Sequence, residues 1–290
     1  MSSSRCSPLL SSTAPDADEL RTSFGGLPGL YAVVMRTAVQ TQFQYRTANY
    51  AYMLGMIAEP VIYLVVWSVV ARSQGGDVEG ITAGEFAAYY IVWTLVRNMN
   101  IVFTPYGWEE RIRKGALSGM LVRPVHPIHY DLAFFAGWKF VVIVLWVPIA
   151  VVLVLIFRPT FDVNALEVGV FLIAIWGAYL IRSMLLWVLG MVTFWTTRVS
   201  ALYDIYFTAE LLLSGRLLPL ALLPAWAATL ADWLPFKYTF GYPIEVLAGD
   251  LSTAELFIGL GLQAVWIGVG ALLVAVVWRF GVRRYSAVGN

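Results

Sequence analysis

Charged side chains are scarce in this sequence. They make up 13% of the 290 residues, whereas hydrophobic residues make up 60%. An ordinary soluble domain has about 25% charged and about 45–50% apolar residues. A water-soluble fold of this composition would expose much of its apolar surface to water, and a bilayer removes that problem. The scarcity of charge therefore excludes an ordinary soluble domain and indicates a single integral membrane domain.

Groups that bind metals or perform catalysis are also few. Cys6 is the only cysteine, which excludes an internal disulfide and a cysteine-rich metal site. His126 and His129 could contact one metal ion, but no third ligand of suitable type accompanies them, so we expect no metal site. Walker A, HExxH and GxSxG motifs are absent. We therefore expect no enzymatic activity, no ATPase site and no cofactor in this chain.

The apolar runs predict an all-α integral membrane fold. Residues 1–29 are rich in serine and proline and lack the apolar core of a secretory signal, so we expect a flexible cytoplasmic tail before a domain over residues 30–290. Alternating apolar and polar residues over 30–46 are typical of an amphipathic helix in the membrane interface. Six spans are then predicted, at about 50–70, 85–106, 130–157, 166–194, 201–213 and 254–278.

The fifth apolar run is shorter than the roughly 20 residues that a full crossing needs. Ser214-Gly215-Arg216 interrupts it. The following segment, 217–242, is hydrophobic but contains several prolines. This pattern predicts re-entrant half-helices, or in part an extension of the fifth span, because irregular backbone cannot face lipid. The residues that mark this region are Arg216, Pro219, Pro224 and Pro235.

Lysine and arginine predict the orientation. With the N-terminus inside and six crossings, twelve of these residues fall in inside segments and four, Arg72, Arg158, Arg216 and Lys237, fall outside. Positive residues concentrate on the cytoplasmic side of membrane proteins. Both termini are therefore predicted to be cytoplasmic.

Four charged residues within the spans have matching depths. Glu59 in the first span lies level with Arg97 in the second, and Arg182 in the fourth lies level with Glu210 in the fifth. Ionisable groups in a bilayer are costly and are usually paired or functional. We predict two interhelical ion pairs, which either fix helix packing or take part in a transport path or proton relay. Asp204 and Lys139 are expected to reach the nearby interface.

The segment 107–123 is the most informative polar stretch. It carries the charged residues Glu109, Glu110, Arg111, Arg113 and Lys114, together with an apolar side that includes Ile112. A solvated loop would explain the charge alone. An amphipathic helix between the second and third spans could instead dock into a groove of a partner protein.

Several motifs give the chain a family resemblance. They are Leu213-Ser-Gly-Arg-Leu-Leu-Pro-Leu, Trp233-Leu-Pro-Phe-Lys-Tyr, Tyr242-Pro-Ile-Glu-Val-Leu-Ala-Gly and Arg283-Arg-Tyr-Ser-Ala-Val-Gly. With these motifs the sequence resembles the ABC-2-type permeases, the membrane subunits of bacterial type-2 ABC exporters, over roughly residues 28–290. Outside the motifs the match is mainly one of topology.

The resemblance implies a location in a bacterial cytoplasmic membrane, a coupling helix between spans two and three, and re-entrant helices between spans five and six. It implies two ATPase subunits, which carry the ATP and Mg, and a second permease, identical or a sister chain. Residues 109–114 would then contact the ATPase. The apolar bundle favours export of a hydrophobic or amphipathic substrate such as a drug or lipid, with no nucleic acid partner. The alternative is an ion-coupled secondary transporter, although no inverted repeat is evident.

Overall fold

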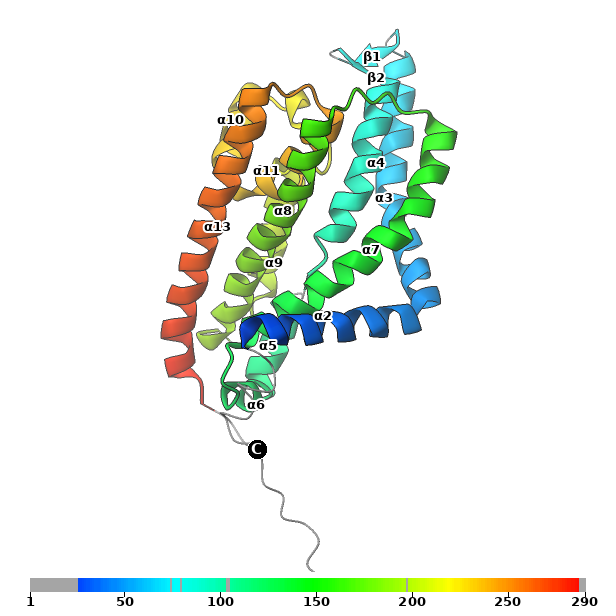
Figure 1. Cartoon of the computed structure of the whole chain (residues 1–290). Helices are drawn as coiled ribbons and strands as arrows, with labels where there is room; N and C mark the ends of the chain where they lie inside the picture. The colour runs from blue at the N-terminus through cyan, green and yellow to red at the C-terminus, as the bar shows by residue number, and fades with distance from the viewer. Residues whose placement is uncertain (1–25, 74, 79, 103–104, 197, 287–290) are drawn as a thin grey trace, which may run out of the picture.

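A computed structural model describes residues 26–73, 75–78, 80–102, 105–196 and 198–286. It is a bundle of long helices with short helices gathered at its two ends (Figure 1). The predicted tail lies outside the described residues up to residue 25. The first described helix, α2, spans Leu27–Gln44 and lies across the ends of the long helices.

Three of the long helices begin at the same end of the bundle, each with a capping box. These helices are α4 (Ala83–Met99), α8 (Ala165–Met191) and α13 (Thr253–Gly281). In each, the Thr, Asn or Ser side chain before the helix accepts a hydrogen bond from the backbone N–H three residues later. The residue at that later position is a glutamate, whose side chain accepts a hydrogen bond from the backbone N–H of the Thr, Asn or Ser. The box satisfies backbone N–H groups that a helix start would otherwise leave unpaired. A small antiparallel hairpin, β1 (Asp77–Val78) and β2 (Ile81–Thr82), leads into α4.

The opposite end of the bundle carries α2, α5 (Pro105–Arg113) and α6 (Leu117–Leu121) (Figure 1). Between the two ends run α3 (Arg46–Ser73) and α7 (Pro127–Phe157). The main core lies between α3, α4, α7, α8 and α12, around Trp93, Phe86 and Tyr90. Gly137 of α7 lets α2 approach closely, because a Cβ there would lie 2.6 Å from the Met35 carbonyl oxygen.

A broken segment follows α8. The remaining elements are the 3-10 turn η1 (Val192–Phe194), α9 (Ser200–Leu213), η2 (Leu220–Leu222), α10 (Ala225–Trp233), α11 (Pro235–Thr239), α12 (Gly241–Ala248) and, after α13, η3 (Val282–Arg284). Each of the three marked prolines begins a helix: Pro219 caps η2, Pro224 caps α10 and Pro235 is the first residue of α11. Proline suits a helix start because its missing N–H would have no partner there.

Within the described residues, four helices are long and apolar enough to cross a membrane. They comprise residues Thr47–Ser73, Pro127–Phe157, Ala165–Phe194 and Thr253–Arg284. The chain is therefore an all-α, multi-pass membrane protein. The predicted second span is shorter than expected, since α4 ends at Met99 rather than near residue 106.

Candidate functional site

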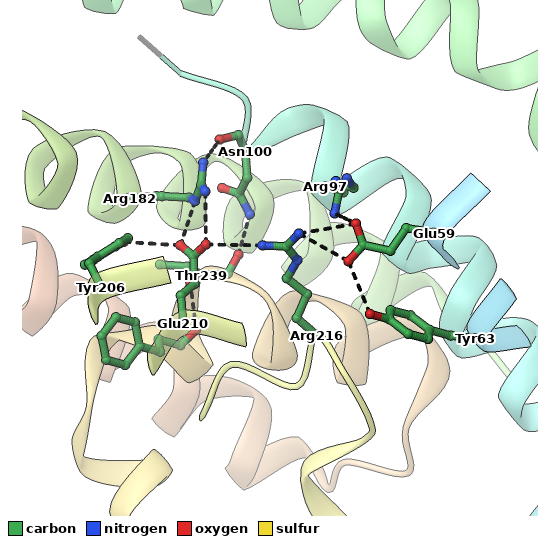
Figure 2. Close-up of polar contacts among 10 residues, drawn as sticks. Glu59, Tyr63, Arg97, Asn100, Arg182, Tyr206, Glu210, Arg216 and Thr239 are labelled. Atoms are coloured by element: carbon green, nitrogen blue, oxygen red, sulfur yellow. Dashed lines mark hydrogen bonds and ion pairs between the residues drawn. The ribbon is translucent and has the colours of Figure 1, made fainter. Parts of the chain in front are cut away.

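The Glu59 carboxylate of α3 meets the Arg97 guanidinium of α4. Arg97 Nη1 lies 2.6 Å from Glu59 Oε2 (Figure 2). The Tyr63 hydroxyl, one turn along α3, donates to Glu59 Oε1 at 3.4 Å. The Glu59 side chain remains 30% exposed and that of Arg97 16%. The structure thus brings together the first pair that the sequence matched by depth.

The second matched pair is more deeply enclosed. Arg182 of α8 donates through Nε to Glu210 Oε1 at 2.7 Å and through Nη2 to Oε2 at 3.0 Å. This two-point geometry suits a planar guanidinium against a carboxylate. The Tyr206 hydroxyl also donates to Glu210, whose side chain is fully buried. A buried carboxylate with these donors is held in place from both α8 and α9.

Arg216 joins the two pairs into one cluster. Its Nη2 lies 3.3 Å from Glu59 Oε1, and its Nη1 lies 3.6 Å from Glu210 Oε2 (Figure 2). Sequence reasoning placed this arginine in an outside segment, but its side chain is only 17% exposed and turns inward. The Ser214-Gly215 break allows this turn, because Gly215 has a φ of 81°. A positive residue at a helix break in an apolar run is the signal that could have identified it.

Aromatic rings enclose the cluster. Arg97 and Arg216 lie over the Trp93 ring, at 5.1 and 5.9 Å from its centroid, and Arg182 and Arg216 lie over Phe240 at 5.6 and 5.8 Å. Such cation–π contacts strengthen when the cation is shielded from water. The five charged side chains are three arginines and two glutamates, so the cluster carries one net positive charge.

The end of α4 explains why the second span is short. Arg182 Nη1 donates to the Asn100 carbonyl at 2.5 Å, and Lys139 Nζ donates to the Ile101 carbonyl. The Asn100 side chain in turn donates to the Thr239 carbonyl of α11. Arg182 and Lys139 thus satisfy the two carbonyls that directly follow α4, so the chain can depart from helical geometry inside the protein. The expectation that Lys139 reaches the interface is wrong, because the Lys139 side chain is fully buried inside the protein.

The predicted partner-binding residues lie on and just after α5, where they divide between two faces. The inner face holds Trp108, which is fully buried, and Ile112, which packs on the same cluster. Arg111 also turns toward the protein, and its two terminal nitrogens donate to Asp131 of α7 at 2.8 and 2.9 Å. Residues of α5 thereby pack against the ends of α7, α8 and α13.

The outer face of α5 carries exposed charge. The side chains of Glu110, Arg113 and Lys114 are 61%, 56% and 72% exposed, while Glu109 is 13% exposed. Glu109 pairs with Arg113, and Glu110 pairs with Lys114, four residues apart along the helix. The hydrogen bond from Lys114 holds the pKa of Glu110 below its usual value. Of the six residues predicted to contact an ATPase, three thus have side chains that are more than half exposed.

The two histidines have separate surroundings. The His126 ring lies 4.2 Å from that of Trp278, and its Nδ1 accepts from the Ile128 N–H as the cap of α7. His129 bonds instead to the Tyr31 hydroxyl at 3.0 Å. Burial, with a smaller contribution from His129, lowers the pKa of His126 to about 4. Among the described residues, no three or more His, Cys, Asp and Glu side chains are grouped to hold a metal ion.

Long apolar helices and a buried charge cluster define a multi-pass helical membrane protein. Residues 57–289 match the family model described as ABC-2 family transporter protein. The chain therefore belongs to the ABC-2 transporter family and is a permease of an ABC-type transporter, a class that works with ATPase subunits. A comparison with curated proteins finds no match.

Proposed function

We propose that this chain is the membrane subunit of an ATP-driven exporter that binds separate ATPases through α5. The observation that supports this most directly is the two-sided character of α5. Its inner face is fixed to α7, α8 and α13 by Trp108 and Arg111, and its outer face presents exposed charges. A partner that pushes on such a helix moves the bundle as well, as the coupling of two conformational states requires.

In this proposal the chain crosses the membrane six times, with α4 and α9 as the shorter crossings. Both termini and α5 then face the cytoplasm, as the distribution of lysine and arginine predicts. The described chain begins and ends at the end of the bundle that carries α5 (Figure 1), which agrees with an even number of crossings. The segment from η2 to α12 would form the re-entrant helices at the outer side.

The chain would form the translocation path together with a second permease, a copy of itself or a sister chain. ATP and Mg would bind on the two ATPase subunits, because the sequence lacks a phosphate-binding loop. The apolar helices favour a hydrophobic or amphipathic substrate. The charge cluster would act chiefly as a fixed link between α3, α4, α8 and α9, because four of its five charged groups lie on these helices.

The test is co-purification with an ATPase encoded beside this chain. Glu110→Lys reverses an exposed charge on α5 and should reduce ATPase retention about tenfold, since like charges at an interface cost binding energy. Asp162→Lys makes the same charge change in the α7–α8 connection, at the opposite end, and should leave retention unchanged.

Transport measurements distinguish the exporter from the ion-coupled alternative. Export should stop when the Walker A lysine of the ATPase is replaced and should continue when a proton uncoupler is added. Export that persists without ATP hydrolysis and fails with the uncoupler would overturn the proposal. Retention that is equally low for both charge variants would exclude α5 as the specific contact.

A further inference from the structure

A groove lies between α2 and the segment that joins α6 to α7. Its volume is about 620 Å³. The α2 side is apolar and is formed by Leu27, Leu30, Val33 and Val34. Leu27 and Val33 are each 47% exposed. A groove with this wall places apolar surface in water unless an apolar group covers it.

The other wall is positively charged. Arg123 lines it, and none of the described residues that line the groove is an aspartate or glutamate. The Arg123 guanidinium lies over the Tyr130 ring, 5.3 Å from the centroid, and no carboxylate in the described part of the chain comes within salt-bridge distance of it. The groove also borders the start of α7, a helix of 31 residues whose N-terminal end carries a partial positive charge.

The position of the groove indicates what could fill it. Helix α2 crosses the ends of the long helices, as a helix in the membrane interface does (Figure 1). At that depth lipid headgroups lie beside acyl chains. A ligand with one negative group for Arg123 and one long apolar chain for Leu30 and Val34 matches both walls.

We propose that this groove binds an acidic phospholipid from the leaflet nearest α2. Its phosphate would contact Arg123, and one acyl chain would lie along Leu27, Leu30 and Val34 of α2. His129 would be the second polar neighbour, because its Nδ1 is taken by Tyr31 and its Nε2 has no partner among the described residues. The bound lipid would fill the space between α2 and the α6–α7 connection. The proposal does not depend on transport or on an ATPase.

Native mass spectrometry of the purified full-length chain tests this directly. Delipidated protein would be titrated with dioleoylphosphatidylglycerol, dioleoylphosphatidylcholine and glycerol 3-phosphate. We expect phosphatidylglycerol to bind about tenfold more tightly than phosphatidylcholine. Both lipids carry a phosphate, but the choline cation of phosphatidylcholine cancels the negative charge and repels Arg123. Arg123→Gln should remove this preference. Val34→Trp, which keeps the charge and fills the groove, should weaken both lipids.

Arg198→Gln is the matched control, since it removes another exposed arginine, between η1 and α9. It should bind phosphatidylglycerol as wild type does. Equal binding of the two lipids by wild type would overturn the proposal, and so would an equal loss in Arg198→Gln. If glycerol 3-phosphate competed as strongly as the lipid does, the groove would be a site for soluble phosphates, and the lipid proposal would be rejected. Circular dichroism and gel filtration would confirm that the variants fold, and the two groove variants lie on separate elements.

Discussion

Arg111 and Asp131 join α5 to α7 by a two-point salt bridge. The distances are 2.8 and 2.9 Å, and the Asp131 side chain is 6% exposed. The bond attaches the helix with exposed charges directly to a membrane span. An arginine that sequence reasoning assigned to a partner therefore has an internal role in the structure.

Asp131→Asn should break this attachment. It leaves the Arg111 charge half-buried without its carboxylate, and breaking a buried pair costs about 3–5 kcal/mol. We expect transport to be lost while the ATPase remains bound through the outer face of α5. Transport assays combined with co-purification would show this. Glu109→Gln, which removes one partner of an i,i+4 pair, is the comparison and should change stability by at most about 1 kcal/mol. Full transport in Asp131→Asn would contradict the role of the bridge.

Glu210→Gln should destabilise the protein more than Glu59→Gln. Glu210 is fully buried between Arg182 and Arg216, whereas the Glu59 side chain is 30% exposed. Loss of the Glu210 charge should cost about 3–5 kcal/mol, and loss of the Glu59 charge about 1–2 kcal/mol. Thermal unfolding in detergent measures both. An equal or reversed order would show that burial does not set the strength of these contacts.

Exchanging the two residues of the Glu59–Arg97 pair should restore only part of the stability of the wild-type protein. Glu59→Arg with Arg97→Glu keeps that pair but places a new guanidinium beside Arg216. If the pair were isolated, the exchange would restore full stability. In the connected cluster, the new arginine at position 59 repels Arg216, so part of the stability stays lost. Adding Arg216→Gln to the exchanged protein should therefore raise its unfolding temperature. If the exchanged protein equals wild type without this addition, Arg216 does not bridge the pairs.

Gly137→Ala should loosen the contact between α2 and α7. A Cβ at this position would lie 2.6 Å from the Met35 carbonyl oxygen and 2.7 Å from the Met35 Cα, and backbone atoms cannot rotate away. Overpacking of this kind costs about 1–3 kcal/mol. Gly261→Ala on α13 is the control, since its Cβ would meet nothing within 4 Å and alanine favours a helix. Unfolding curves of equal midpoint for the two variants would refute the close approach.

Stability should fall as the pH drops from about 6.5 toward 4, in part through His126. Its pKa is about 4 in the folded protein and about 6.5 when exposed, so the unfolded chain binds the proton more readily in this range. His126→Asn keeps a side chain that can cap α7 and should show a smaller fall. Unfolding temperatures measured from pH 7 to 5 would test this. Identical profiles for both proteins would exclude His126 as a contributor.

The sequence by itself determined the class of the protein. Apolar runs predicted the helices, because a bilayer requires long segments whose backbone groups pair internally. The predicted ends agree with α3, α7, α8 and α13 to within a few residues. Depth along the spans was enough to match Glu59 with Arg97 and Arg182 with Glu210, since rise per residue is fixed in a helix.

Only the tertiary structure decided how the two ion pairs are connected to each other and to the rest of the bundle. Arg216 joins the two pairs because a glycine at a helix break turns the chain inward, and no periodic pattern encodes that turn. The chain leaves helical geometry after α4 where Arg182 and Lys139, distant in sequence, satisfy the carbonyls of Asn100 and Ile101. The division of α5 into a buried and an exposed face depends on Asp131 and Trp278 being nearby. Local sequence sets the helices, and contacts between distant segments set how they are joined.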